Sequence, residues 1–257
     1  MLETIKRSLS QMSRPSGKFD AQRYFRGDHN LRFYNTGTQP MRAFARSVYE
    51  AKRGVWSVDD AMILADELIT DDYLEAKSVG IEIVARFHRS FRPSLLPRWK
   101  RWLTNNHSAN WATTDSICGQ LIGPLLVRHP ELAERLRAWS KDRNMWVRRA
   151  SIVGLIAIVR KGMALHLAYD IAQTLHKDEE DLIQKAVGWV LRECGKVDAK
   201  RLETYLLSNG SMIPRTTLRY AIERFPEAKR RRLLRLTVGA GFSRSRAAKR
   251  PSAAATG

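Results

Sequence analysis

Residues 110–126 read NWATTDSICGQLIGPLL, and this stretch decides the fold class. Trp111 and Asp115 stand four residues apart, so on a helix both side chains lie on the same face. At about 100° per residue Asp115 falls at the margin of the apolar stripe, which predicts a partly buried carboxylate. Alternatively, Asp115 caps the helix and Trp111 anchors a loop, because aspartate is common at helix N-termini. The apolar residues that follow have the spacing of one buried helix face: Ile117, Leu121, Ile122, Leu125 and Leu126.

The segments on both sides of this stretch have the same helical spacing. A first helix is expected from about Met41 onward, and Ser57 has the position of an N-cap for the next helix. No stretch has the alternating β-branched pattern of a strand, so the sequence predicts an all-α fold. Further helices are expected over residues 61–69, 71–88, 95–103, 130–139, 146–159, 164–175, 182–193, 199–207 and 214–224.

Composition and charge restrict the class of function. The chain has 257 residues, 44% of them hydrophobic, which is enough for a substantial core. Its formal net charge of +19 favours a polyanionic partner, either nucleic acid or an acidic membrane surface. The longest apolar run, 152–159, is too short to span a bilayer. Cys118 and Cys194 lie in apolar helical patterns and are expected to be core thiols in a reducing compartment. A cytoplasmic, nucleoid-associated protein is expected.

Three segments with different compositions follow one another along the chain. Residues 1–18 are a polar lead-in, and residues 19–236 form the helical domain. Residues 237–257 are rich in Arg, Lys, Gly, Ser and Ala, which predicts a disordered basic tail. Such a tail adds salt-sensitive affinity for DNA that does not depend on sequence, or it serves only as a solubilising end.

The spacing of three residues predicts a helical repeat. Arg149 follows Trp111 by 38 residues, and Trp189 follows Arg149 by 40. HEAT repeats, which are pairs of helices, recur at roughly 40 to 47 residues. We therefore expect these residues at similar positions in successive repeats of a right-handed α-α superhelix, on its concave, basic face.

Two basic helical segments contain candidate DNA-binding residues. Arg148 and Arg149 lie in an apolar helix with no carboxylate nearer in sequence than Asp142, so Arg149 is well placed to bind a phosphate through two parallel hydrogen bonds. Alternatively, one of the two arginines forms a salt bridge to a neighbouring helix. In the segment 183–193, an aromatic side chain lies between two cations on one helix face, an arrangement that suits a sugar-phosphate backbone; these are Lys185, Trp189 and Arg192. Alternatively, Trp189 packs in the core.

Three motifs resemble those of the AlkD-type alkylpurine DNA glycosylases, which are repair enzymes built from HEAT-like repeats. They are Asn-Trp-x-x-x-Asp at 110–115, Trp-Val-Arg-Arg-Ala-Ser-Ile at 146–152 and the segment 183–193. The similarity extends over residues 33–225. It implies that Asp115 takes the place of the catalytic carboxylate, Trp111 and Trp189 that of two aromatics facing the damaged nucleotide, and Arg149 that of a backbone-binding arginine. Arg42 and Arg46 fall, more loosely, where the family contacts DNA.

The resemblance implies a specific reaction. A purine alkylated at N3 or N7 is cationic, so it leaves without protonation, and one ionised carboxylate can stabilise the charge that develops at C1′. We therefore expect a monomeric, monofunctional glycosylase that acts on alkylated purines in double-stranded DNA, with no cofactor and no metal, since the histidines and cysteines lack metal-ligand spacing. The alternative is a non-catalytic helical-repeat module that binds damaged or branched nucleic acid.

Overall fold

A computed structural model describes residues 1–15, 17, 25 and 31–237 of the chain. Over these residues every regular element is a helix, and the only strand-like pairing is an isolated bridge between Arg32 and Tyr73. The predicted all-α class is therefore confirmed. In the same part of the chain, every helix is too short or too polar to cross a lipid bilayer. The basic tail expected at 237–257 lies outside the described residues except for Thr237.

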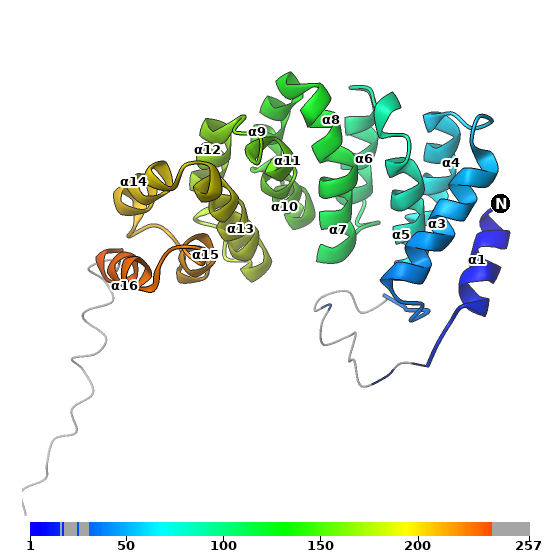
Figure 1. Cartoon of the computed structure of the whole chain (residues 1–257), viewed down its shortest axis with the longest axis horizontal. Coiled ribbons are helices and arrows are strands. Elements are labelled where there is room, and N and C mark those ends of the chain that lie inside the picture. Colours follow the sequence, from blue (N-terminus) through cyan, green and yellow to red (C-terminus); the bar gives the residue numbers. More distant parts are fainter. Residues whose placement is uncertain (16, 18–24, 26–30, 238–257) are drawn as a thin grey trace, which may run out of the picture.

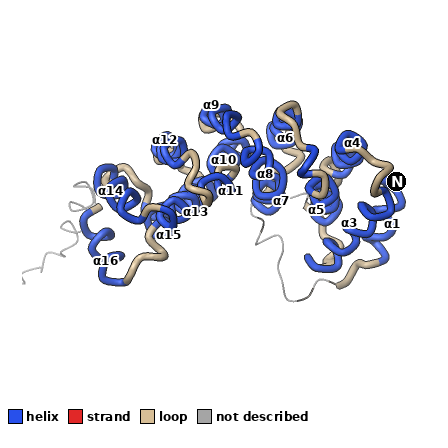
Figure 2. Tube along the Cα trace, turned by 45° about the horizontal axis from the view of Figure 1, so that its top comes forward, coloured by secondary structure: helices blue, strands red, loops and turns tan. Residues whose placement is uncertain are grey.

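The helices form two layers that bend into one arc, as Figures 1 and 2 show. Neighbouring helices of the inner layer, on the concave side, pack against one another in chain order. They are α3 (Thr38–Lys52), α5 (Leu74–Ala85), α7 (Trp111–Ile117), α10 (Met145–Val153), α13 (Asp181–Val197) and α15 (Arg215–Ala221). The outer layer consists of α4 (Val58–Leu68), α6 (Leu95–Thr104), α9 (Arg135–Trp139), α12 (Leu165–Leu175) and α14 (Ala199–Asn209). This is the superhelix of helical repeats that the sequence predicts.

The remaining helices complete the two ends and two of the repeats. Helix α1 (Leu2–Gln11) packs on α4 and α5 at one end, and α16 (Glu227–Leu236) packs on α14 at the other. Helix α8 (Gly123–Arg128) continues the direction of α7, and α11 (Ile156–Val159) follows α10. The predicted helix 146–159 is thus interrupted at Gly154 and Leu155. Two 3₁₀ turns, His88–Ser90 and Pro130–Glu134, lie between longer helices.

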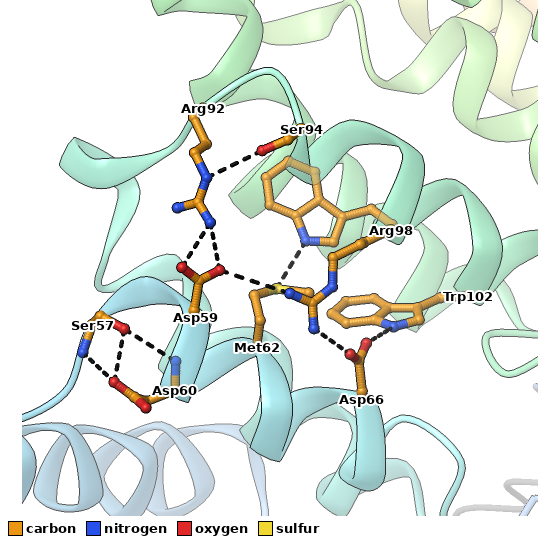
Figure 3. A network of polar contacts seen from close by, with 10 residues as sticks. Ser57, Asp59, Asp60, Met62, Asp66, Arg92, Ser94, Arg98 and Trp102 are labelled. Atoms are coloured by element: carbon orange, nitrogen blue, oxygen red, sulfur yellow. Dashed lines mark hydrogen bonds and ion pairs between the residues drawn. The ribbon is translucent and has the colours of Figure 1, made fainter.

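The outer layer of the first repeats is joined by polar contacts from α4 to α6, shown in Figure 3. Ser57 caps α4 through a reciprocal capping box with Asp60, which confirms the predicted N-cap. Asp66 of α4 accepts hydrogen bonds from Arg98 and from the indole of Trp102, the latter at 2.6 Å. These contacts fix the position of α6 behind the inner layer. They lie away from the inner helices that carry the candidate site.

The core runs continuously between the two layers. The five apolar residues of the stretch 117–126 named above are fully buried, as its periodicity predicts. Cys118 and Cys194 are both free and buried, so the expectation of core thiols is confirmed. Burial raises the pKa of the Cys194 thiol to about 12, which makes it a poor nucleophile at neutral pH.

Candidate active site

Helix α7 begins at Trp111 and places Asp115 one turn inside the helix. The N-cap is Asn110, whose Oδ1 accepts a hydrogen bond from the backbone N–H of Thr113 at 2.9 Å. The alternative interpretation of Asp115 as the capping residue is therefore wrong. The carboxylate is free of the helix terminus, and it projects from the same helix face as Trp111.

A π-helical turn, Cys118–Ile122, follows α7 directly. Pro124, early in α8, has no backbone N–H to continue the regular hydrogen-bonding pattern. The wider turn ahead of it joins α7 and α8 without a loop. Turns of this kind occur frequently at functional sites, and this one begins three residues after Asp115. Helical periodicity alone did not predict it.

Asp115 forms a bidentate ion pair with Arg149 of α10. Nε of Arg149 donates to Oδ1 of Asp115, and Nη2 donates to Oδ2, each at 2.8 Å. Nη1 donates to the backbone carbonyl of Leu182 at the start of α13. The side chain of Asp115 is only 18% exposed, and that of Arg149 only 6%. Arg149 therefore links three consecutive inner helices, and of the two interpretations of this arginine pair the interhelical salt bridge is present in the structure.

The protonation of Asp115 depends on two opposing effects. Burial raises the pKa of its carboxyl above the ordinary value, while the hydrogen bonds and charge of Arg149 oppose that rise. Both carboxylate oxygens accept hydrogen bonds from an arginine that is always charged, so the geometry is that of the ionised acid. The site thus contains a partly desolvated negative charge that is held in one orientation.

A cavity of about 1170 Å³ opens in front of this pair, on the concave side. Its walls come from α7, α10, α13 and α15, and both predicted tryptophans contribute to them. Three basic and three acidic side chains are among the lining residues, so the charges in the cavity wall balance. The lining residues are Asn106, Ala109, Trp111, Asp115, Met145, Trp146, Arg149, Glu180, Asp181, Leu182, Lys185, Trp189, Arg192 and Tyr220.

Trp111 also borders a second cavity, of about 440 Å³, on the side of α3 and α5. The ring of Phe25 stacks on its indole, with centroids 5.4 Å apart and planes inclined by 14°. Phe25 is itself buried and packs on Phe33. One face of the Trp111 indole is thereby held by aromatic packing, which restricts its orientation in the cavity wall.

The other predicted residues on α13 also lie at the cavity, each with an acidic neighbour. Lys185 pairs with Asp181 one turn earlier, at 2.6 Å, and both side chains are largely exposed. Nη1 of Arg192 donates to Glu223, which follows α15. The side chain of Lys185 is 40% exposed, and exposed ion pairs contribute little energy, so this cation remains able to exchange its partner for a phosphate group. The side chain of Arg192 is only 19% exposed, so a phosphate contact there would require its bond to Glu223 to break.

Arg148 lies outside the cavity lining. Its Nε donates to Asp178 at 2.6 Å, and its Nη1 donates to the carbonyls of Asp142 and Arg143. Its side chain is 19% exposed. In this arrangement Arg148 joins α10 to the segment before α13, so its predicted contact with DNA would require these bonds to break.

Arg42 and Arg46 lie on α3, at the second cavity or beyond it. Nε of Arg42 donates to Glu82 of α5 at 2.8 Å, and Glu82 also accepts from Gln120. Arg46 is exposed and has no ion pair among the described residues. Their assignment to DNA binding stays a prediction, and both are separated from Asp115 by Trp111 and the second cavity.

Eight of the lining residues were not candidate site residues in the sequence, among them Met145, Trp146 and Tyr220. Tyr220 is 38% exposed and reaches the cavity because α15 packs unusually close to α13. At the contact stands Gly188, where an added Cβ would lie 2.4 Å from the Cβ of Tyr220. Gly188 and Tyr220 both lie within the range of family similarity, 33–225, but only the packing shows that they meet.

Among the described residues, no group of three or more His, Cys, Asp or Glu side chains is arranged to hold a metal ion.

Comparison with known proteins identifies the family. A family described as DNA alkylation repair enzyme matches residues 5–225. The chain belongs to this family. DNA alkylation repair is therefore its role, and DNA its substrate. No curated protein matches the chain. A solved structure titled "Predicted DNA alkylation repair enzyme from Enterococcus faecalis" superposes with a TM-score of 0.70 at 16% identity, covering 88% of this chain and 96% of the other.

A second member of the same fold is smu.31 from Streptococcus mutans UA159. It superposes with a TM-score of 0.54 at 13% identity and covers 73% of this chain and 100% of its own. At these identities the two structures establish a shared fold for this DNA alkylation repair family member. The assignment to the family comes from the sequence match over nearly the whole chain.

Proposed function

We propose that this protein is a monofunctional DNA glycosylase that removes cationic N3- or N7-alkylated purines from double-stranded DNA. The observation that carries the proposal is the ionised, partly buried carboxylate of Asp115 in the wall of a large open cavity, with Trp111 and Trp189 in the same wall. The membership in a DNA alkylation repair family supports a damaged nucleotide as the substrate.

The proposed reaction needs no acid catalyst. As the bond between C1′ and N9 of the purine breaks, its electron pair moves onto the base and neutralises the positive charge of the alkylated ring. The deoxyribose becomes an oxocarbenium ion, which the Asp115 carboxylate stabilises. Water then adds to C1′ and loses its proton, giving an abasic site and a neutral alkylpurine. Two indole faces favour the same developing positive charge.

The balanced charges of the cavity wall fit a cationic substrate. A strongly positive cavity would repel both the alkylated purine and the oxocarbenium ion. Here Asp115, Glu180 and Asp181 compensate the three basic side chains of the lining. The reacting cation is therefore accepted at the site, while the phosphate backbone is bound by basic residues of the cavity wall and around it.

In this proposal Arg149 holds Asp115 in place and also contacts a backbone phosphate. A guanidinium has five N–H groups, and the contacts to Asp115 and Leu182 use three of them. Two N–H groups remain, one on each Nη atom. Arg149 can therefore keep the carboxylate oriented while it donates to a phosphate at the cavity wall.

The test is release of 7-methylguanine from methylated duplex DNA by the wild type and by Asp115→Asn. We expect excision to fall by about 10²-fold or more, because the amide no longer carries the charge that stabilises the oxocarbenium ion. Affinity for DNA should remain, since the phosphate contacts are made by other residues. A thermal melt establishes that the variant is folded.

Asp170→Asn is the matched control, because Asp170 is an exposed carboxylate of the outer helix α12 that pairs with Arg137. It should release 7-methylguanine at the wild-type rate. Equal rates for Asp115→Asn and the wild type would remove Asp115 from the mechanism.

One observation favours a second candidate function, a non-catalytic module that binds damaged or branched DNA. Both oxygens of Asp115 are already engaged by Arg149, and such a pair is also a plain interhelical salt bridge. The excision assay separates the two functions. A non-catalytic module would bind methylated DNA and release no base.

A further inference from the structure

A second group of basic residues surrounds a single carboxylate beyond the end of the cavity. Glu193, near the C-terminal end of α13, has a side chain that is only 2% exposed. Its Oε2 accepts from Nε of Arg160 and from Nζ of Lys196, both at 2.9 Å. Its Oε1 accepts from Lys196 at 2.7 Å and lies 3.8 Å from Nε of Arg192. Three cations thus converge on one acid.

The acid is fixed and ionised, whereas two of the cations reach solvent. The hydrogen bonds and charges of Arg160 and Lys196 lower the pKa of Glu193 in spite of its burial. The side chains of Arg160 and Lys196 are 55% and 44% exposed. Among the described residues, the two Nη groups of Arg160 have no hydrogen-bond partner. The Nε contact therefore orients the guanidinium and leaves its outer donors available.

This cluster continues the basic face of α13 that lines the cavity. Lys185, Trp189, Arg192 and Lys196 follow one another at intervals of four, three and four residues. At about 100° per residue, Lys196 projects within the same narrow stripe as the other three. Lys196 lies about 16 Å along the helix axis from Lys185, at a rise of 1.5 Å per residue. The stripe therefore leads from the cavity to the Glu193 cluster.

We propose that Arg160 and Lys196, held in position by Glu193, bind a backbone phosphate of the DNA duplex outside the reaction cavity. The paired Nη donors of Arg160 match the geometry of phosphate oxygens, and Lys196 adds a point charge beside them. Glu193 is a positioning residue, since it acts through these two cations. This proposal relies on DNA binding and deepens the proposed function by adding a contact site remote from Asp115.

The experiment measures the affinity of the full chain for an unmodified, fluorescently labelled DNA duplex by anisotropy at several salt concentrations. For the double variant R160Q/K196Q we expect affinity to fall by about 10-fold or more, and the slope of log K against log salt to lose about 1 to 2 units. The excision rate constant at saturating enzyme should stay at the wild-type value. The glutamine amides can still donate hydrogen bonds to the buried Glu193, and a thermal melt establishes that the variant is folded.

The matched control is R92Q/R137Q, which removes the same charge from two exposed, ion-paired arginines of the outer layer. It should bind as the wild type does. Equal affinity of R160Q/K196Q and this control would overturn the proposal. If no variant and no wild-type protein releases 7-methylguanine, the proposed glycosylase activity fails, but the binding data still decide this inference.

Glu193→Gln tests the positioning role, because a positioning effect and a net-charge effect predict opposite changes in DNA affinity. Removing one negative charge should strengthen DNA binding if only net charge matters. Loss of positioning should instead weaken binding, because Arg160 and Lys196 lose one of the two acceptor oxygens and the negative charge that order them. We expect weaker binding of the folded variant, as judged by circular dichroism. Tighter binding would show that Glu193 does not organise a phosphate site.

Discussion

Burial and the contact with Arg149 have opposite effects on the pKa of the Asp115 carboxyl group. Desolvation favours its neutral form, while the bidentate contact favours the ion. The contact serves two purposes in the proposed mechanism, since it keeps the acid ionised and fixes its orientation toward the cavity. Removal of either partner leaves the other as a buried charge without compensation.

This coupling predicts a non-additive double-mutant cycle in the free energy of unfolding. Asp115→Asn and Arg149→Gln should each reduce it by about 3 kcal/mol, because each leaves a buried polar or charged partner unsatisfied. The double variant should lose clearly less than the sum of the two. Urea denaturation of the four proteins provides the measurement.

The exposed pair Arg137 and Asp170 is the control for this cycle, since both side chains are about half exposed. Its coupling energy should be below about 1 kcal/mol. Additive losses at Asp115 and Arg149 would mean that the two residues contribute to stability independently of their contact.

At the residue scale, the sequence indicated which side chains lie near one another, but it did not indicate the contacts between them. Trp111, Asp115, Lys185, Trp189 and Arg192 all lie in one cavity wall. The partner of Arg149 was missed, because Asp115 is 34 residues away and periodicity within one helix carries no information about contacts between helices. The same holds for Arg148 and its partner Asp178.

At the scale of the helices, the packing of α15 on α13 completes the cavity. An added Cβ at Gly188 would meet the Cβ of Tyr220 at 2.4 Å and the carbonyl oxygen of Thr217 at 2.6 Å. Thr217 also donates a hydrogen bond to the carbonyl of Gln184 in α13. The absence of a side chain at Gly188 therefore lets Tyr220 reach the cavity wall.

Gly188→Ala should separate α15 from α13. We expect a loss of about 1 to 3 kcal/mol in the free energy of unfolding, because the contact involves backbone that no rotamer change can relieve. Excision of 7-methylguanine should slow as well, since Tyr220 and the end of α13 line the proposed site. Urea denaturation and the excision rate at saturating enzyme check the two effects.

The matched variant is Gly119→Ala, an exposed position of the π turn with no atom within 4 Å of the added Cβ. It should be unchanged in stability or gain up to about 1 kcal/mol. Identical behaviour of the two alanine variants would show that the close approach of α15 does not depend on Gly188.

Helix order was predictable from hydrophobic periodicity, but the irregularities within helices were not. The π turn after α7 and the interruption between α10 and α11 both fall inside segments that are mostly apolar. In such segments several helical geometries bury the same side chains, so the pattern does not discriminate between them. Packing against neighbouring helices decides the geometry, as at Gly123, whose added Cβ would lie 2.8 Å from Ala157.

Across the whole molecule, charged residues serve two different functions: binding the phosphate backbone and stabilising a cationic transition state. The chain carries a net charge of +19, yet the described lining of the cavity is balanced. A phosphate backbone requires many cations, whereas a cationic transition state requires none nearby. Composition predicted the polyanionic partner, but only the folded chain shows that the excess charge lies outside the reaction cavity.

This division predicts different salt dependences for binding and for chemistry. The affinity of the wild type for an unmodified duplex should fall with log salt at a slope of roughly −4 or steeper, as expected when several phosphates displace their counterions. The rate of excision from methylated DNA at saturating enzyme should change little over the same range, because Asp115 and Arg149 are buried and poorly screened. Anisotropy and single-turnover release of 7-methylguanine measure the two. A rate constant that falls in parallel with affinity would place exposed charges in the chemical step and contradict the assignment to Asp115.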